Sequence, residues 1–180
     1  MDYKQRLEEW NSTNKYKLEM HFLYSLMQPK RNERILDYGC GIGTMCKFLL
    51  TNTEAKIYGH DQRNYLLNPP IWFLENIYFP VDKVYMMHSI AHIVNIDNVL
   101  EKFHEEYLNN NGRIYVITPN KLWLDIKNKN KNYKSDESVI KHYSLQELKE
   151  LFCKFKLVNC GQFGEELEGQ NERLFLIAEK

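Results

Sequence analysis

The chain of 180 residues is long enough for a single domain with a sizeable buried core. Its 43% hydrophobic and 13% aromatic residues are typical of a globular protein and argue against disorder. With 24 basic and 24 acidic residues the formal net charge is zero, which argues against a nucleic-acid partner gripped through its phosphate backbone.

The cysteines and the N-terminus bear on the compartment. The four cysteines form no C-x-x-C pair and no spacing typical of a metal finger, so we interpret them as free thiols in a reducing compartment. The first ten residues are charged and lack the apolar core of a signal peptide. No stretch approaches the roughly 18 apolar residues of a membrane span. We therefore expect a cytoplasmic protein with no membrane partner.

The first predicted element is a helical stretch over residues 3–27. Apolar residues recur at helical spacing in its second half, at Leu18, Phe22, Leu23, Leu26 and Met27. Asn11, Ser12 and Asn14 indicate a break into two helices, and Pro29 ends the second one.

A glycine-rich turn follows the first predicted strand, which covers residues 34–38 and contains Asp37. Three glycines then follow at every second position: Gly39, Gly41 and Gly43. A helical pattern starts at Met45. A strand, a glycine-rich turn and a helix in this order are typical of a nucleotide-like binding site on an α/β sheet. The glycines let the backbone approach such a ligand closely. A dinucleotide fingerprint would need a glycine or alanine at the sixth position, where this chain has Thr44, so a nicotinamide cofactor is disfavoured.

A second strand over residues 55–59 ends in His60-Asp61. Asp61 follows Asp37 by 24 residues, close to the spacing of about 20 at which a Rossmann-like fold places an acid on the ribose of its ligand. A carboxylate can accept hydrogen bonds from both ribose hydroxyls at once. Asp61 is therefore a candidate ribose contact.

The next region is short. Only 21 residues separate Asp61 from Lys83, which leaves room for one helical turn over residues 63–67 and a short third strand over residues 71–74. Glu75 and Asn76 follow that strand.

The following segment predicts a strand, a helix and another strand. The strand covers residues 82–87 and leads into His88-Ser89-Ile90-Ala91-His92. An amphipathic helix is expected over residues 95–108, ended by the asparagines before Gly112. A fifth strand over residues 113–118 ends at Pro119-Asn120.

The last part of the chain begins with a lysine- and asparagine-rich segment, residues 121–138. We expect a solvated loop there, and the alternative is a mobile lid whose lysines meet an anionic group of the substrate. Ser144 and Glu147 form a capping box for a helix that ends near residue 152. Two closing strands over residues 156–163 and 172–179 predict an antiparallel hairpin.

Two stretches resemble one family. Residues 35–44, ILDYGCGIGT, resemble motif I of the class I S-adenosylmethionine-dependent methyltransferases. Residues 82–120 resemble the type-11 and type-12 methyltransferases, in which a strand, a histidine, a helix, Gly-Arg, a strand and Thr-Pro-Asn follow one another. The resemblance implies an α/β fold: a Rossmann-like three-layer sandwich with a seven-stranded, mostly parallel sheet and an antiparallel C-terminal hairpin.

The same resemblance implies how one domain over residues 1–180 is divided. Residues 1–29 would form an N-terminal helical lid with Trp10 and Tyr16 as lid aromatics. Residues 30–180 would form the core, with a substrate-side insertion at 119–143.

The resemblance also implies the cofactor. The methyl donor would be S-adenosylmethionine, and the product S-adenosylhomocysteine. The implied cofactor-binding residues are Asp37, Gly39, Cys40, Gly41, Gly43, Asp61, Gln62, His88 and Ser89. The family often places a polar contact to the adenine where Glu75 or Asn76 falls.

Methyl transfer is an in-line displacement that needs alignment and exclusion of water, and a nearby base helps a hydroxyl or amine acceptor. The candidates on the substrate side are His88, His142 and Tyr143. His88 and His92 also match the ends of an E-x-x-E-H motif that binds a divalent metal in related enzymes. Ala91 replaces the second glutamate of that motif, so we expect no metal.

These observations predict an enzyme that methylates oxygen or nitrogen of a small molecule, whose negative charge would suit the lysines of residues 121–134. One alternative is an RNA methyltransferase. The other is a catalytically inactive, methyltransferase-like binding module whose short region 62–82 has lost the substrate wall.

Overall fold

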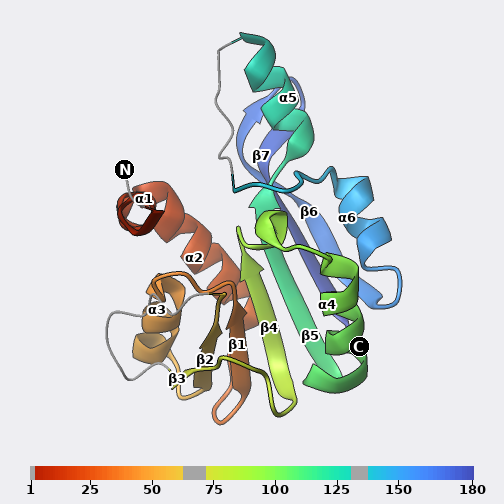
Figure 1. The fold of residues 1–180 in the computed structure, drawn as a ribbon. Helices are drawn as coiled ribbons and strands as arrows, with labels where there is room; N and C mark the ends of the chain where they lie inside the picture. Colours follow the sequence, from red (N-terminus) through yellow and green to blue (C-terminus); the bar gives the residue numbers. More distant parts are fainter. Residues whose placement is uncertain (1–2, 63–71, 131–137) are drawn as a thin grey trace.

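The computed structural model describes residues 3–62, 72–130 and 138–180 (Figure 1). Seven strands form one sheet in the order β3-β2-β1-β4-β5-β7-β6. Their bounds are β1 Arg34–Tyr38, β2 Lys56–His60, β3 Trp72–Phe73, β4 Val81–Met87, β5 Leu108–Pro119, β6 Lys156–Leu167 and β7 Gln170–Glu179. β7 is antiparallel to both of its neighbours, β5 and β6, and all the other neighbouring pairs in this sheet are parallel. The predicted mostly parallel sheet with a C-terminal antiparallel hairpin is confirmed.

Helices cover both faces of the sheet, and two apolar clusters fill the space between the layers (Figure 1). One cluster lies beneath α2 (Asn14–Met27) and α3 (Thr44–Asn52), and the other beneath α4 (Ile96–Lys102) and α6 (Leu145–Leu151). Successive side chains of a strand point to opposite faces. In β4, Val84 and Met86 belong to one cluster and Tyr85 and Met87 to the other. The predicted three-layer sandwich is confirmed.

The expected break in the N-terminal helix is present between α1 (Tyr3–Ser12) and α2. Thr13 caps α2, because its hydroxyl accepts a hydrogen bond from the Tyr16 backbone N–H at 3.2 Å. The buried face consists of Tyr16, Glu19, Met20, Leu23 and Met27. Leu18, which the apolar pattern had placed on this face, is 71% exposed, because the true face includes the acid Glu19.

The helix expected over residues 95–108 is shorter. α4 ends at Lys102, a single π-helical turn covers Phe103–Tyr107, and β5 already begins at Leu108. The asparagines at 109–111 therefore lie in the strand, where the β4–β5 register shifts. Asn109 donates to the Asp82 carboxylate at 2.7 Å, which ties this start of β5 to β4.

The loop expected over residues 121–138 is wrong for its first part, because residues Lys121–Asn130 form helix α5. Trp123 and Leu124 are buried there, and this apolar contact stabilises a helix in a segment rich in lysine and asparagine. Residues 131–137 lie outside the described residues, as does the helical turn expected over residues 63–67.

The C-terminal hairpin has longer strands and a tighter turn than expected. β6 continues to Leu167 and β7 starts at Gln170, so only Glu168 and Gly169 connect them. Both have positive φ, 49° and 76°, as two-residue hairpin turns require. Within the described ranges, no helix is long and apolar enough to cross a membrane.

Candidate active site

A cleft of about 890 Å³ opens at the carboxyl ends of the parallel strands. The strand order reverses between β1 and β4, and ligands of open α/β sheets bind at such a point. The loops after β1, β2 and β4 contribute Gly39, Asp61 and His88 to its lining. Trp10 of α1 and Trp123 of α5 also line it, so the cleft lies between the N-terminal helices and α5.

The glycine loop packs closely against the loop after β4. Gly39, Gly41 and Gly43 have φ angles of 86°, 51° and 75°, which favour glycine. A Cβ atom on Gly39 would overlap the side chain of Ser89. The Ser89 hydroxyl donates to the Tyr38 carbonyl at 2.5 Å. The absence of a side chain at Gly39 therefore lets the ends of β1 and β4 lie close together at the cleft.

Most amides of this loop donate to acceptors inside the protein. Gly39 and Cys40 donate to the His60 carbonyl at 2.7 and 3.0 Å, and Gly41 donates to the Asp61 carboxylate at 2.9 Å. A pyrophosphate bound at such a loop would need these N–H groups for itself. The loop therefore suits a nucleoside ligand that has no phosphate at this point, which agrees with the sequence argument from Thr44 against a nicotinamide cofactor.

The predicted cofactor residues fall into two groups. Gly39, Cys40, Gly41, Asp61, Gln62, His88 and Ser89 line the cleft. Asp37 and Gly43 do not line it. Gly43 is the N-cap of α3, and Asp37 lies behind the loop with 4% of its surface exposed.

Asp37 is enclosed by Cys46 and Tyr85. The Cys46 thiol donates to its carboxylate at 3.3 Å, and the Tyr85 hydroxyl is a second hydrogen-bonding partner. Burial raises the pKa of Asp37 to about 7, against the opposing effect of these two hydrogen bonds. Asp37 therefore supports the loop from behind.

The three substrate-side candidates occupy different places. His88 and His142 line the cleft. The Nε2 atom of His88 lies 2.5 Å from Glu19. The Nδ1 atom of His142 is buried and has no hydrogen-bonding partner among the described residues. Burial, together with nearby His92, lowers the pKa of His142. Tyr143 is 4% exposed and packs in the core, so we leave it out of the proposed site.

The histidines do not assemble a metal site in the described part of the chain, where no three histidine, cysteine or acidic side chains come close enough to share an ion. His92 points its Nδ1 at the Ser138 carbonyl, 3.0 Å away. Glu75 and Asn76 do not line the cleft either.

Sequence reasoning missed several cleft residues. Tyr38 and His60 stack with ring centroids 4.8 Å apart, and both line the cleft. The sequence could have indicated both residues, because Tyr38 directly precedes Gly39 and His60 directly precedes Asp61. Arg173, which lines the cleft, was also missed, as was its buried partner Glu19. Glu19 lies one helical turn from Tyr16 and from Leu23, a place on an apolar face where an acid needs a partner.

Residues 10–159 match the model of a family described as a methyltransferase domain. A comparison with curated proteins returns no match. Solved methyltransferase structures match at low identity across nearly the whole chain. A SAM-dependent methyltransferase from Archaeoglobus fulgidus has a TM-score of 0.73 at 15% identity, covering 99% of this chain and 100% of that one.

Two further structures are similar. Magnesium protoporphyrin IX methyltransferase from Synechocystis PCC 6803, with bound SAH, has a TM-score of 0.66 at 12% identity, covering 100% of this chain and 88% of that one. A chain from the complex between the Haloferax volcanii Trm112 methyltransferase activator and a methyltransferase has a TM-score of 0.73 at 12% identity, covering 98% of this chain and 92% of that one.

The sheet order and the cleft at its reversal point define a class I, S-adenosylmethionine-dependent methyltransferase fold. The chain belongs to the methyltransferase domain family, and its methyl donor is S-adenosylmethionine.

Proposed function

We propose that the protein transfers a methyl group from S-adenosylmethionine to an oxygen or nitrogen atom of a small molecule by in-line displacement. The observation that carries the proposal is the close packing of Gly39 on Ser89 where the strand order reverses, with Asp61 hydrogen-bonded to the same loop. When bound, the donor supplies an electrophilic methyl group. The chain's own residues bind it, align the acceptor and exclude water.

The donor end of the cleft is formed by the loops after β1 and β2. Asp61 and Gln62 line it where a ribose would lie, and a carboxylate can accept from both ribose hydroxyls. The stacked rings of Tyr38 and His60 offer a flat surface for a base. Trp10 and Tyr16, which come from the N-terminal helices, would close over this end as a lid.

The acceptor end is formed by α5 and the residues before α6. The Trp123 indole N–H and the His142 Nδ1 are buried without hydrogen-bonding partners in the described structure. An unpaired buried polar group costs about 1–3 kcal/mol, so a polar acceptor that paired with either would be favoured. Burial lowers the pKa of His142, so its ring is neutral and can form a hydrogen bond with the acceptor.

Two features favour a small acceptor over RNA. The cleft volume of about 890 Å³ is within the usual range of small-molecule sites and must also contain the donor. The net charge is zero, so no overall field attracts a polyanion. The Lys127 ammonium group, 4.2 Å from the Trp123 ring centroid, would suit one negative charge on the acceptor.

Calorimetry with S-adenosylmethionine tests the donor site. Asp61→Ala should weaken binding at least about tenfold, because hydrogen bonds to a charged group contribute about 1.5–3 kcal/mol. Asp61→Asn keeps an oxygen for the Gly41 N–H and separates the effect of charge from that of loop geometry. The exposed acid Asp97 does not line the cleft, so Asp97→Ala should bind as the wild type does. Undiminished binding by Asp61→Ala would contradict the proposal.

Methyl-labelled donor distinguishes the acceptor classes. Label should enter the small-molecule fraction of a cell extract and not the RNA fraction. Entry into RNA would replace the small-molecule proposal with RNA methylation. Donor binding without label transfer to either fraction would indicate a binding module.

A further inference from the structure

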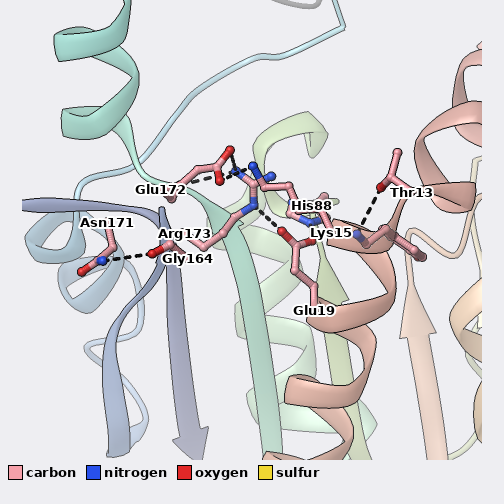
Figure 2. A network of polar contacts seen from close by, with 9 residues as sticks. Thr13, Lys15, Glu19, His88, Gly164, Asn171, Glu172 and Arg173 are labelled. Carbon is pink, nitrogen blue, oxygen red and sulfur yellow. Dashed lines mark hydrogen bonds and ion pairs between the residues drawn. The ribbon is translucent and has the colours of Figure 1, made fainter. Parts of the chain in front are cut away.

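Five polar side chains form one continuous chain of contacts, and all of them except Glu19 line the cleft (Figure 2). In order along this chain they are Lys15, Glu172, Arg173, Glu19 and His88. They come from α2, from β7 and from the residue directly after β4, so three distant parts of the sequence meet here.

Glu19 is the centre of this polar chain. One carboxylate oxygen lies 2.7 Å from Arg173 Nε and the other 2.5 Å from His88 Nε2. Glu19 is 3% exposed and Arg173 4%. Arg173 also bonds Glu172 at 3.1 Å and lies over the Trp10 ring at 5.6 Å.

Stability alone does not explain this network. Desolvating buried ions costs several kcal/mol per ion, and well-packed apolar side chains often serve a core as well or better. Burial by itself would raise the pKa of Glu19, but the hydrogen bonds and charges of His88 and Arg173 hold it below its usual range. Glu19 is therefore an ionised carboxylate in a buried place, pointed at a histidine of the cleft.

An ionised carboxylate can only accept hydrogen bonds, so the His88 nitrogen that faces Glu19 must carry its proton. The other ring nitrogen, Nδ1, then holds the lone pair whenever the ring is neutral. Nδ1 makes no hydrogen bond to the described part of the chain. His88 adopts φ 61°, a conformation that a non-glycine residue rarely takes and that is often found at functional sites.

We infer that Glu19 is a positioning residue that fixes the Nε2–H tautomer of His88 and so presents Nδ1 to the methyl acceptor, with Arg173 holding Glu19 in place. This inference rests on the proposed function, because it needs an acceptor in the cleft. As the acceptor lone pair forms its bond to the methyl carbon, the acceptor's O–H or N–H proton moves to Nδ1 and the bond from sulfur to methyl breaks. The imidazolium formed faces the Glu19 carboxylate and later releases its proton to water.

The arrangement also makes the base depend on the N-terminal helices. Glu19 belongs to α2 and Arg173 to β7, and 154 residues separate them. Trp10 of α1 packs edge-on to the His88 ring, with centroids 6.0 Å apart. His88 therefore has its oriented form only while α2 is packed on the sheet.

Nitrogen-15 spectra of the histidine rings test the inference without any acceptor. The His88 signals are assigned by their loss in His88→Asn, and spectra are recorded at a pH where the ring is neutral. The wild type should show the Nε2–H tautomer as the dominant form. In Glu19→Gln the side-chain amide can donate as well as accept, so this preference should fall to a mixture of both tautomers.

Glu33→Gln is the matched control, because Glu33 forms an equally short ion pair, 2.5 Å to Lys83, and does not line the cleft. It should leave the His88 tautomer unchanged. A dominant Nδ1–H tautomer in the wild type would overturn the inference even if Glu19→Gln failed to fold, as would an unchanged tautomer in Glu19→Gln. Calorimetry with S-adenosylmethionine on the same samples reports the donor site separately, so failure of the proposed function would be distinguished from failure of this inference.

Discussion

Gly39 illustrates how one missing side chain shapes the site. Its φ of 86° would cost alanine about 1–2 kcal/mol. A Cβ would in addition overlap Ser89, an overpacking effect of about 1–3 kcal/mol. We expect Gly39→Ala to lower the free energy of unfolding by the sum of both, measured by urea denaturation.

Gly169 provides the matched comparison. Its φ is 76°, but a Cβ there would meet no atom of the described residues within 4 Å, so Gly169→Ala should show the conformational cost alone. Combining Gly39→Ala with Ser89→Gly should recover the packing part only. Equal losses in Gly39→Ala and Gly169→Ala would show that the contact with Ser89 does not constrain the loop.

Asp37 should make stability depend on pH. Burial raises its pKa from 3.8 to about 7, so between these values the folded protein keeps a proton that the unfolded chain has lost. The folded state then binds more protons, and its stability falls as pH rises from about 4 to about 7. Each unit of pKa difference is worth about 1.4 kcal/mol.

Asn cannot ionise. As the pH rises from 5 to 7.5, the free energy of unfolding should therefore fall less in Asp37→Asn than in the wild type. Urea denaturation at several pH values measures the difference between the two curves. Asp97→Asn, at an exposed position, should follow the wild type. Parallel curves for the wild type and Asp37→Asn would contradict the assignment of this pH dependence to Asp37.

At the scale of elements, the start of α6 follows directly after His142 and Tyr143. Ser144 accepts from the Glu147 N–H at 3.2 Å, and the Glu147 carboxylate accepts from the Ser144 N–H at 2.8 Å. The hydrogen bond from the Ser144 backbone is the largest cause of the lowered pKa of Glu147, about 2. This confirmed capping box ends the segment that brings His142 to the cleft.

Ser144→Ala should therefore destabilise the protein by about 1 kcal/mol, within the range of 0.5–2 kcal/mol for lost N-caps. Ser25→Ala, on the exposed surface of α2, should change stability by no more than about 0.5 kcal/mol. Chemical denaturation of both variants measures the contrast. A similar small effect in both would mean that the cap does not stabilise α6.

At the scale of the whole molecule, donor binding couples to unfolding. A ligand at 100 times its dissociation constant stabilises the folded state by about 2.7 kcal/mol. For a chain of this size that corresponds to a rise in Tm of about 5–10 °C. We expect S-adenosylmethionine and S-adenosylhomocysteine to raise Tm in this way.

NAD at the same concentration should leave Tm unchanged, because the Gly39, Cys40 and Gly41 amides already donate within the protein. Thermal denaturation followed by circular dichroism measures all three ligands. A shift with NAD and none with S-adenosylmethionine would contradict the interpretation of the loop.

Much of the architecture could be predicted because it depends on local patterns. The first strand, the glycine turn, the start of α3 and the capping box of α6 each follow from residues within one turn or strand of one another. Elements that depend on tertiary contacts were predicted less well. α5 forms because Trp123 and Leu124 find a buried surface, and α4 ends early because β5 extends to pair with β4.

By itself the sequence determined part of the cleft lining: Gly39 and Gly41 after β1 and Asp61 after β2 reach the cleft, because the ends of parallel strands lie at one edge of the sheet. Only the tertiary structure placed Asp37 behind the loop and Tyr143 in the core. Only the tertiary structure joined Glu19, Arg173 and His88, since 154 residues separate Glu19 from Arg173. No periodicity in the chain predicts this ion pair, because Glu19 and Arg173 meet only after helix α2 packs on the sheet. Once both charges are buried there, each needs a partner of opposite charge.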